Sequence, residues 1–415
     1  NYINTSLSPI KGLCFCKMNK FSHIVVFIFL NGIFLFAQED IIDISKEWEL
    51  SRESRYFFDT PQFENQLNYY PSFSFQPTYK FKWNEGYENF IFSIYFNLDR
   101  DKNRTYWDLR EMYYQKANNN WELNIGFKKV FWGVTESSHL VDIVNQTDAL
   151  KSFDGEEKLG QPMVQFSWFL SGLGSLDLFY LPYHRKRGFP GEKGRFRFNN
   201  VLDSEDIKYE SGKGEFNTDF AARWKHYFGA FDIGLSYFSG NGREPYFKFD
   251  EKNNIQAYYP IIDQYGIDLQ ITAGALLLKF ESIYRTAKEQ QFLAMDAGFE
   301  FTFSNVDKNG LDVGVLAEYL YDERGDWALS GLQDDIFYGS RLAFNDSQDT
   351  SLIAGGIHDF QTSSNLFTIE ASRRFKNNMF VSLEGRIFSG VSDKELFLLY
   401  FRQDSYFRIS VSKYY

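Results

Sequence analysis

Apolar and polar residues alternate in segment after segment of this chain of 415 residues. The alternation is clear in WELNIGFK (121–128), in FLAMDAGFEFTF (292–303) and in NLFTIEASRRF (365–375). A period of two residues over about ten positions predicts strands with one buried face rather than amphipathic helices. About ten residues is also the length that a tilted strand needs to cross the hydrocarbon core of a membrane.

The residue types on the two faces separate a membrane barrel from a soluble sheet. Phe, Trp and Tyr make up 20% of the chain and gather on the apolar face, whereas charges occupy the other face. The mean hydropathy is nevertheless negative, −0.40, because lipid-facing and lumen-facing residues alternate in a barrel wall. These features favour a transmembrane antiparallel β-barrel, and a soluble β-sandwich or β-helix is the alternative. The net charge of −11 argues against a nucleic-acid partner.

The connections between the predicted strands are alternately short and mostly long. Turns such as NNN (118–120) and KNN (376–378) separate longer connections such as 132–160 and 183–216. Bacterial outer-membrane barrels combine short periplasmic turns with longer outer loops in this way. The all-β segment 49–415 is therefore predicted to form eighteen strands with both ends in the periplasm, or sixteen if its weak first segment is not a strand.

The beginning of the chain has the features of an export signal. Residues 1–17 precede the first Met and are interpreted as a non-native leader, residues 18–37 as a secretory signal peptide, and residues 38–48 as a periplasmic segment before the barrel. Cys14 and Cys16 are the two cysteines of the chain and lie in that leader. Neither a disulfide nor a metal site nor a cofactor is predicted.

The last predicted strand, SYFRISVSKYY (405–415), ends on an aromatic residue. Barrels of this class commonly end so, because the barrel-assembly machinery binds the last strand. That machinery, the lipid and lipopolysaccharide of an outer membrane, and small-molecule solutes are the predicted partners.

Several stretches carry a resemblance to known barrels: FWGVTESSHLVDIVNQTD (131–148), GEEKLGQPMV (155–164), AEYLYDERG (317–325), RLAFNDSQDTSLIAG (341–355) and EASRRF (370–375). They resemble a family of Gram-negative outer-membrane β-barrels and, more coarsely, the porin and alginate-export group. The leader ending in FAQ resembles those of Bacteroidota. The resemblance implies the fold and an outer-membrane location. It implies no substrate and no catalytic residues.

The connection 132–160 contains Ser137, Ser138, His139 and Asp142 almost side by side. The members of a catalytic triad converge from separate segments, and the glycines of a nucleophile elbow are absent here. A membrane hydrolase is therefore only a weak alternative, and no enzyme is predicted. Ser138 is instead expected to cap a short helix with an apolar stripe of Leu140, Ile143 and Val144.

A connection of this length is commonly functional, and an eighteen-stranded barrel leaves an aqueous lumen unless something fills it. We predict that 132–160 folds inward as a constriction loop, and a loop packed on the outer rim is the alternative. The predicted constriction residues are the polar side chains of this connection together with the bases of HRKRGFPGEKGRFRF (184–198): Glu136, His139, Asp142, Asn145, Asp148, Arg185, Lys186, Arg187, Arg195 and Arg197. The two sets, with Asp154, are expected to attract each other in or over the pore. A lipopolysaccharide-binding patch is the alternative for the bases.

The alternation also predicts which charges face the lumen, where they cost far less than against lipid. The predicted wall residues are Arg223, Lys279, Glu281, Glu300, Glu318, Arg341, Glu370, Arg374, Glu384 and Arg386. Glu370 is expected to pair with Arg386, and Arg374 with Glu384. The sequence thus predicts a porin-like channel for passive diffusion of small polar or anionic solutes. A non-conducting envelope scaffold or partner-binding barrel is the alternative.

Overall fold

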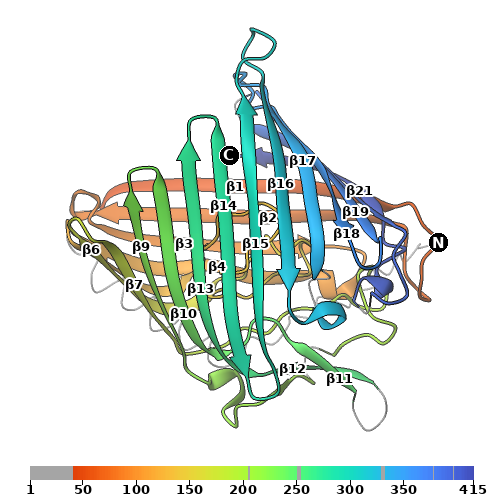
Figure 1. Ribbon diagram of the computed structural model, residues 1–415. Helices are drawn as coiled ribbons and strands as arrows, with labels where there is room; N and C mark the ends of the chain where they lie inside the picture. Colours follow the sequence, from red (N-terminus) through yellow and green to blue (C-terminus); the bar gives the residue numbers. More distant parts are fainter. Residues whose placement is uncertain (1–40, 204–205, 250–253, 329–331, 377, 396) are drawn as a thin grey trace, which may run out of the picture.

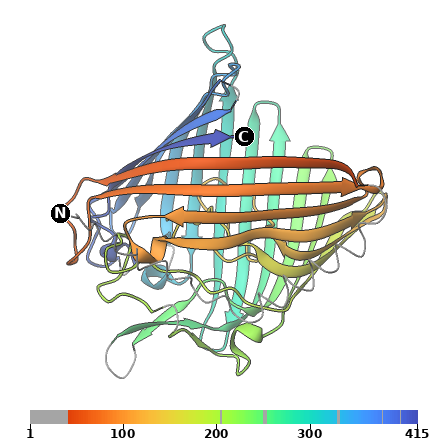
Figure 2. The same ribbon diagram turned by 180° about the vertical axis from the view of Figure 1, so that it is seen from behind.

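The structure, a computed structural model, describes residues 41–203, 206–249, 254–328, 332–376, 378–395 and 397–415. Over these residues eighteen strands form one closed antiparallel sheet, the wall of a transmembrane β-barrel. The strands of the near wall cross those of the far wall in Figure 1, and Figure 2 shows the same barrel from behind. The wall strands are β1 (Ile41–Phe57), β2 (Tyr69–Trp83), β3 (Glu88–Leu98), β4 (Tyr106–Ala117), β5 (Trp121–Lys128), β6 (Gln161–Leu170), β7 (Gly174–Leu181), β9 (Asp219–Phe228), β10 (Phe231–Asn241), β13 (Ile261–Ala273), β14 (Leu276–Ala287), β15 (Gln291–Phe303), β16 (Asp312–Asp322), β17 (Asp334–Ala343), β18 (Ser351–Asp359), β19 (Asn365–Phe375), β20 (Met379–Ser389) and β21 (Tyr406–Tyr414).

The barrel closes between its first and last strands. β1 pairs with β21 from Glu49 opposite Tyr414 to Phe57 opposite Tyr406, and it pairs with β2 on its other side. The predicted barrel fold and the number of eighteen strands are confirmed, and the alternative of sixteen is wrong. The weak segment near Glu49 is a full strand because both of its edges are paired.

β1 begins at Ile41, earlier than the predicted Glu49, so residues 41–48 belong to the wall and pair with β2. Ile44 and Trp48 continue the outward apolar set, but Lys46 stands between them and hides the alternation. The predicted leader and signal peptide, residues 1–37, lie outside the described residues.

Short turns gather at one end of the barrel, the short-turn end, and longer loops at the other, the loop end. Gly229 and Gly274 open two tight turns at φ +62° and +64°, a left-handed conformation that favours glycine. The start of β1 pairs with the end of β2 beside a short turn, and the Tyr414 N–H donates to Asn378 in another. The start of β1 and the end of β21 therefore both lie at the short-turn end, as predicted.

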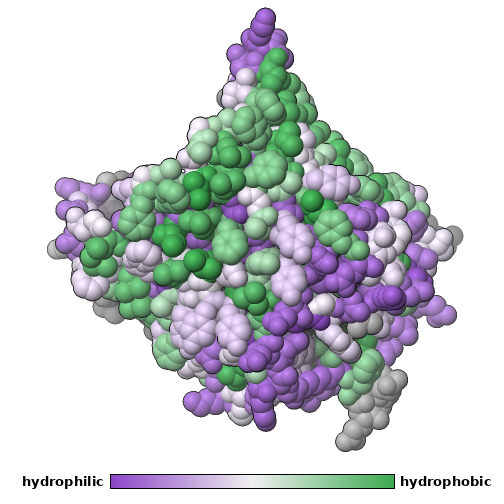
Figure 3. Space-filling view, in the orientation of Figure 1, coloured by the Kyte–Doolittle hydropathy of each residue, from purple (hydrophilic) through white to green (hydrophobic). Residues whose placement is uncertain are grey.

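The alternating apolar and polar residues of each strand face the outside and the inside of the barrel, respectively. On β14, Leu278 and Tyr284 are exposed on the outside, whereas Lys279, Glu281 and Arg285 are buried within the barrel. Figure 3 shows the apolar side chains gathered over the strands, with hydrophilic ones toward the ends. An apolar exterior of this kind suits contact with lipid. None of the helices in the described part of the chain is long and apolar enough to cross a membrane.

The loop end carries a second, smaller sheet. β11 (Tyr246–Phe249) pairs antiparallel with β12 (Ile255–Tyr259), and β12 pairs parallel with β8 (Lys208–Tyr209). This sheet packs with aromatic residues of neighbouring loops, Phe189 and Phe198 among them. Single turns of 3₁₀ helix occur at η1 (Asn84–Gly86), η2 (Lys102–Arg104), η3 (Gly214–Phe216), η4 (Gly325–Trp327) and η5 (Leu398–Tyr400). The loops of this end are thus packed structures rather than loose connections.

Candidate functional site

The connection between β5 and β6, residues 129–160, enters the barrel, and we call it the inner loop. Trp132, Val141, Ile143 and Val144 pack against inward-facing residues of β7, β10, β13, β14 and β15 in one apolar cluster. This packing does not agree with the alternative of a loop packed on the outer rim. The predicted short helix after Ser138 is wrong, because no helix forms between residues 138 and 146. The apolar residues that suggested its stripe are buried against the wall instead.

Two wall carboxylates bind the backbone of the inner loop, mainly just before the predicted helix. Glu281 of β14 accepts hydrogen bonds from the N–H groups of Val134 (2.6 Å), Thr135 (3.1 Å) and Val141 (3.2 Å). Of the three, Val141 lies in the first turn of the predicted helix, where its N–H has no backbone partner, and a charged acceptor binds such a group more strongly than a neutral one. Gly133 makes the close approach possible, because a Cβ there would lie 3.0 Å from the Glu281 carboxylate.

Glu318 of β16 binds the next residues of the inner loop. It accepts from the N–H groups of Glu136 and Ser137, each at 2.8 Å, and from the Ser137 hydroxyl at 2.6 Å. Glu281 and Glu318 are both almost fully buried. We call these two carboxylates the latch. The sequence predicted that both face the lumen, but not that they hold the inner loop.

The side chain of Glu136 joins a cluster of wall charges beside the latch. It contacts Arg341 at 2.6 Å and Lys279 at 3.6 Å, and both bases also contact Glu300. The cluster connects β14, β15 and β17 through the inner loop. Four of the predicted residues therefore meet at one place in the lumen.

Asp154, further along the inner loop, reaches the opposite side of the barrel. It pairs with Arg386 of β20 at 2.9 Å, and Arg386 also pairs with Glu370 at 2.7 Å. Burial alone would raise the pKa of Asp154, but the charge of Arg386 together with hydrogen bonds from Ser152 and Glu156 leaves this pKa below its usual value. The predicted Glu370–Arg386 pair is confirmed.

The predicted pair of Arg374 with Glu384 is wrong. Glu384 stands directly opposite Arg408 of β21 and pairs with it. Arg374 stands opposite Phe380, which lies four residues from Glu384 on the side of the short turn, and the Arg374 side chain is exposed. A diagonal neighbour is within reach across a strand pair, but a residue four positions away is not.

The remaining polar residues of the inner loop form contacts within the loop and with β4. Asp148 pairs with Arg110 of β4 at 2.5 Å, and Asp142 pairs with Lys158 at 3.1 Å. The Asn145 amide donates to the carbonyl oxygens of Lys128 (2.9 Å) and Leu159 (2.8 Å), which joins the two stems of the loop. Burial raises the pKa of Asp142, although the charge of Lys158 opposes this.

His139 and its neighbours do not form a catalytic site. The His139 Nε2 atom lies 3.1 Å from Glu156, whereas the Ser137 hydroxyl binds Glu318 and Asp142 binds Lys158. Burial alone would lower the pKa of His139, but the hydrogen bond to Glu156 and the surrounding acids leave this pKa above its usual value. The side chains expected of a hydrolase thus point to three different partners.

The second long connection, residues 182–218, meets the inner loop, but not through the predicted pairing of acids with bases. The Arg185 side chain donates to the Gly160 carbonyl and to Asp108 of β4, and Arg187 donates to Gln146. Phe153 of the inner loop stacks on Phe196 at 4.6 Å.

Three other bases of this connection also have partners. Lys186 pairs with Glu215 and Arg195 with Asp404, whereas Arg197 donates to carbonyl oxygens, that of Glu64 among them. Among the ion pairs of the described residues, none joins a base of 184–198 to an acid of the inner loop. Asp108 of the wall and the loop residues Glu215 and Asp404 pair with three of these bases instead.

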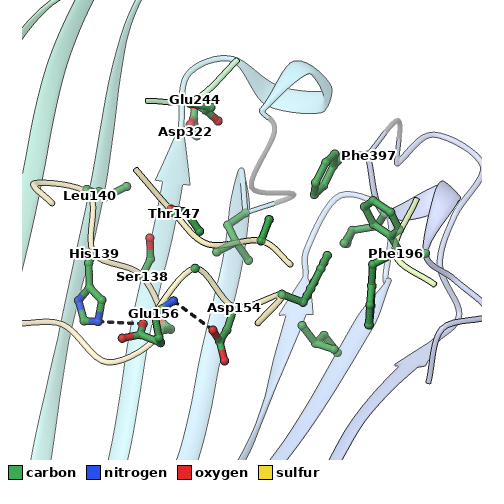
Figure 4. Close-up of a pocket in the computed structure, with 18 of the residues that line it drawn as sticks. Ser138, His139, Leu140, Thr147, Asp154, Glu156, Phe196, Glu244, Asp322 and Phe397 are labelled. Atoms are coloured by element: carbon green, nitrogen blue, oxygen red, sulfur yellow. Dashed lines mark hydrogen bonds and ion pairs between the residues drawn. The ribbon is translucent and has the colours of Figure 1, made fainter. Parts of the chain in front are cut away.

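A cavity of about 410 Å³ lies between the inner loop, the loops of the loop end and the wall from β14 to β20. Figure 4 shows Ser138, His139 and Glu156 on one side of it and Phe196 and Phe397 on the other, with Glu244 and Asp322 at its edge. Arg285 and Arg324 both pair with Glu244, at 2.8 Å and 3.2 Å. Burial would raise the pKa of Glu244, but these charges lower it to about 2.

No protein-family model matches this chain, and no curated protein matches it. Solved structures of variants of the porin from Rhodopseudomonas blastica do match. One variant is 12% identical, and the triple variant is 11% identical; each match covers 90% of this chain and 100% of the porin, with a TM-score of 0.44. A structure described as "Asymmetric conductivity of engineered proteins" matches with the same coverage and TM-score at 11% identity. These likenesses are too distant to decide function.

Two groups of residues at this site were not predicted from the sequence. Asp108 of β4 pairs with Arg185 of the second long connection, and Arg110 of β4 pairs with Asp148 of the inner loop. The sequence does indicate these two residues, because they are charges two positions apart on the inward face of a predicted strand. The aromatic residues beside the cavity, Phe153, Phe196 and Phe397, come from three separate loops and have no shared pattern. Only the fold brings them together.

Proposed function

We propose that this protein is a porin-like outer-membrane channel through which small polar solutes diffuse passively, and that the inner loop narrows its path. The observation that carries the proposal is the uneven filling of the lumen. The apolar cluster of the inner loop packs against β6 to β15, whereas inward-facing charges on the opposite side stay accessible to water. The side chains of Arg341 and Glu370 are 37% and 46% exposed.

The proposed path runs along that opposite side. It leads from the loop end through the cavity, then past the contacts of Glu136 with Arg341 and of Asp154 with Arg386. Beyond them lie Glu370 and Arg374 toward the short-turn end. The narrowest place would then be lined by charges of both signs, one set from the inner loop and one from the wall.

Single-channel recording in planar bilayers tests the proposal. The purified protein is expected to give stepwise currents, because a lumen that holds water conducts ions. A barrel that inserts, resists heat and denaturant as a folded barrel does, and yet gives no current would contradict it.

A sealed barrel that serves as a scaffold or binds a partner is the second candidate. The apolar cluster around Val141 and Val144, both 0% exposed, favours it, since that side of the lumen is packed like a protein core. The same recording separates the two candidates. A hydrolase is disfavoured, because Ser137, His139 and Asp142 do not converge.

An anion preference stays a prediction. It rested on Arg185, Lys186 and Arg187, whose side chains contact carboxylate or amide oxygens within the protein. Bases engaged in this way attract a passing anion less than free ones would. A location in the outer membrane of a Bacteroidota-like cell, kinship with alginate-export barrels, and binding of lipopolysaccharide and the barrel-assembly machinery are further parts of the proposal.

A further inference from the structure

The cavity on the proposed path has two unlike walls. Phe153, Phe196, Phe198, Phe397 and Phe401 line one wall, and their rings pack on one another at centroid distances such as 4.6 Å and 5.0 Å. The side facing them carries polar and charged side chains such as Ser138, His139 and Glu156, with aliphatic ones such as Leu140 between them (Figure 4). A cavity of about 410 Å³ has the size of a site for a small organic molecule. The two walls together suit a molecule with an apolar body and a polar head.

The expected charge of the polar head depends on which charged residues of the cavity already have a partner of opposite charge. Arg285 and Arg324 pair with Glu244, Arg386 with Asp154, and Lys158 with Asp142. Arg243 pairs with Asp219 at 2.8 Å. Arg187 donates to Gln146 and to a backbone carbonyl, and its charge acts on Glu244. The bases around the cavity are therefore committed to partners within the protein.

Three carboxylates of the cavity wall have no such partner. Asp335 of β17 and Asp359 of β18 stand directly opposite each other, both inward, and Glu395 of the loop 390–405 lies beside them. Each is 2% exposed. Within the described residues none of the three forms an ion pair with a base. Their hydrogen-bond donors are neutral: Gln333 donates to Asp359 at 2.6 Å, and Thr362 donates to Glu395 at 2.7 Å.

This arrangement is costly when all three carboxylates are charged and no cation is bound. Like charges directly opposite on paired strands repel, and a buried carboxylate without a base is expensive. Burial raises the pKa of Glu395, and the charge of Asp359 and a hydrogen bond with its carboxyl raise this pKa further, against the hydrogen bonds from Thr362 and Gln333. A positive group between these carboxylates would remove the repulsion. The phenylalanines of the same loop, Phe397 and Phe401, would cover what is attached to it.

We propose that the cavity binds a small organic cation, a primary ammonium group on an aromatic or similarly apolar body. The ammonium donates to Asp335, Asp359 and Glu395, which supply acceptors for its three N–H groups. The apolar body packs on the phenylalanine wall, where ring faces also attract positive charge. The inference deepens the proposed channel function, because it names a class of solute that the path would retain.

Calorimetric titration of the whole protein in detergent tests the site with phenethylammonium as the probe. The matched probes 2-phenylethanol and phenylacetate keep the ring and change the charge. Phenethylammonium is expected to bind about tenfold more tightly than either, and Asp359→Asn to weaken it by about tenfold. Asp326→Asn, an equal charge change on an exposed residue of a neighbouring loop, is the control and is expected to leave binding unchanged.

A second variant guards against loss of fold. Asp335→Asn removes the like-charge pair, so its thermal midpoint without ligand is expected to equal or exceed that of the wild type, while phenethylammonium binding falls. Equal binding of the neutral alcohol, unchanged binding in Asp359→Asn, or binding of calcium without binding of the amine would overturn the proposal. The titration needs no ion current. A barrel that gives no current but binds the amine would therefore refute the proposed channel and support the binding site. A barrel that conducts but does not bind the amine would support the channel and refute the binding site.

Discussion

Replacing Glu318 with alanine should release the tip of the inner loop from the wall. Glu318 accepts the N–H groups of Glu136 and Ser137 at 2.8 Å each, and the Ser137 hydroxyl at 2.6 Å. The alanine variant keeps the barrel strand but leaves two partly buried N–H groups without an acceptor. An unsatisfied buried donor costs about 1–3 kcal/mol. The two together should destabilise the closed position of the tip by about 2–4 kcal/mol, since water will reach one of them in part.

Hydrogen exchange of the peptide that contains residues 133–141 measures this release directly. Because about 1.4 kcal/mol corresponds to a factor of ten, the amides of Glu136 and Ser137 should exchange about 30- to 1000-fold faster in Glu318→Ala. Glu370→Ala is the matched control, since Glu370 also faces the lumen but contacts Arg386 rather than the inner loop. Unchanged exchange in Glu318→Ala, with strand amides as protected as in the wild type, would refute the latch.

Three further outcomes follow from the same contacts. Deleting residues 136–148 should enlarge the single-channel conductance, and an unchanged value would place the inner loop outside the path. Replacing Arg185 and Arg187 with glutamine should shift the ion preference away from anions, and an unaltered reversal potential would exclude the predicted anion attraction. The pKa of Glu244 is lowered to about 2, so its pairing stabilises the loop end above about pH 4.5 and is lost as the pH falls toward 2. Proteolysis of that end should therefore rise over this range in the wild type, and be high and flat in Glu244→Gln; an equal rise in both would contradict the assignment.

The barrel itself was predictable from the sequence because its signal is local. Each wall strand shows its two faces in its own residues, and each short turn is recognisable by its length. Glu281, Glu318 and Arg341 were assigned to the lumen on that basis, and their contacts with the inner loop agree with it. The start of the barrel was misjudged only where Lys46 interrupts the outward apolar set.

The contacts across the lumen were not predictable, because they depend on which loop segment meets which strand. Ser138 and the apolar residues after it suggest a helix in isolation, but Glu281 of the wall accepts the N–H of Val141, which the predicted helix cap would otherwise have bound. Arg185 would attract an acid of the inner loop if both were free, but Asp108 of the wall reaches it first. Which partner a side chain binds depends on the distances between segments in the folded protein, and these distances cannot be read from the sequence.

The solute path along the β17–β20 side is the central claim, and a cysteine at Glu370 tests it most directly. In a background without Cys14 and Cys16, Glu370→Cys places a thiol beside the proposed narrow place, whereas Tyr265→Cys places one on the outward, lipid-facing side, where Tyr265 is 55% exposed. A charged, membrane-impermeant methanethiosulfonate added to an open channel should lower the current of Glu370→Cys in discrete steps and leave that of Tyr265→Cys unchanged. If Glu370→Cys is modified, as mass spectrometry would show, and its current does not change, solutes take another path.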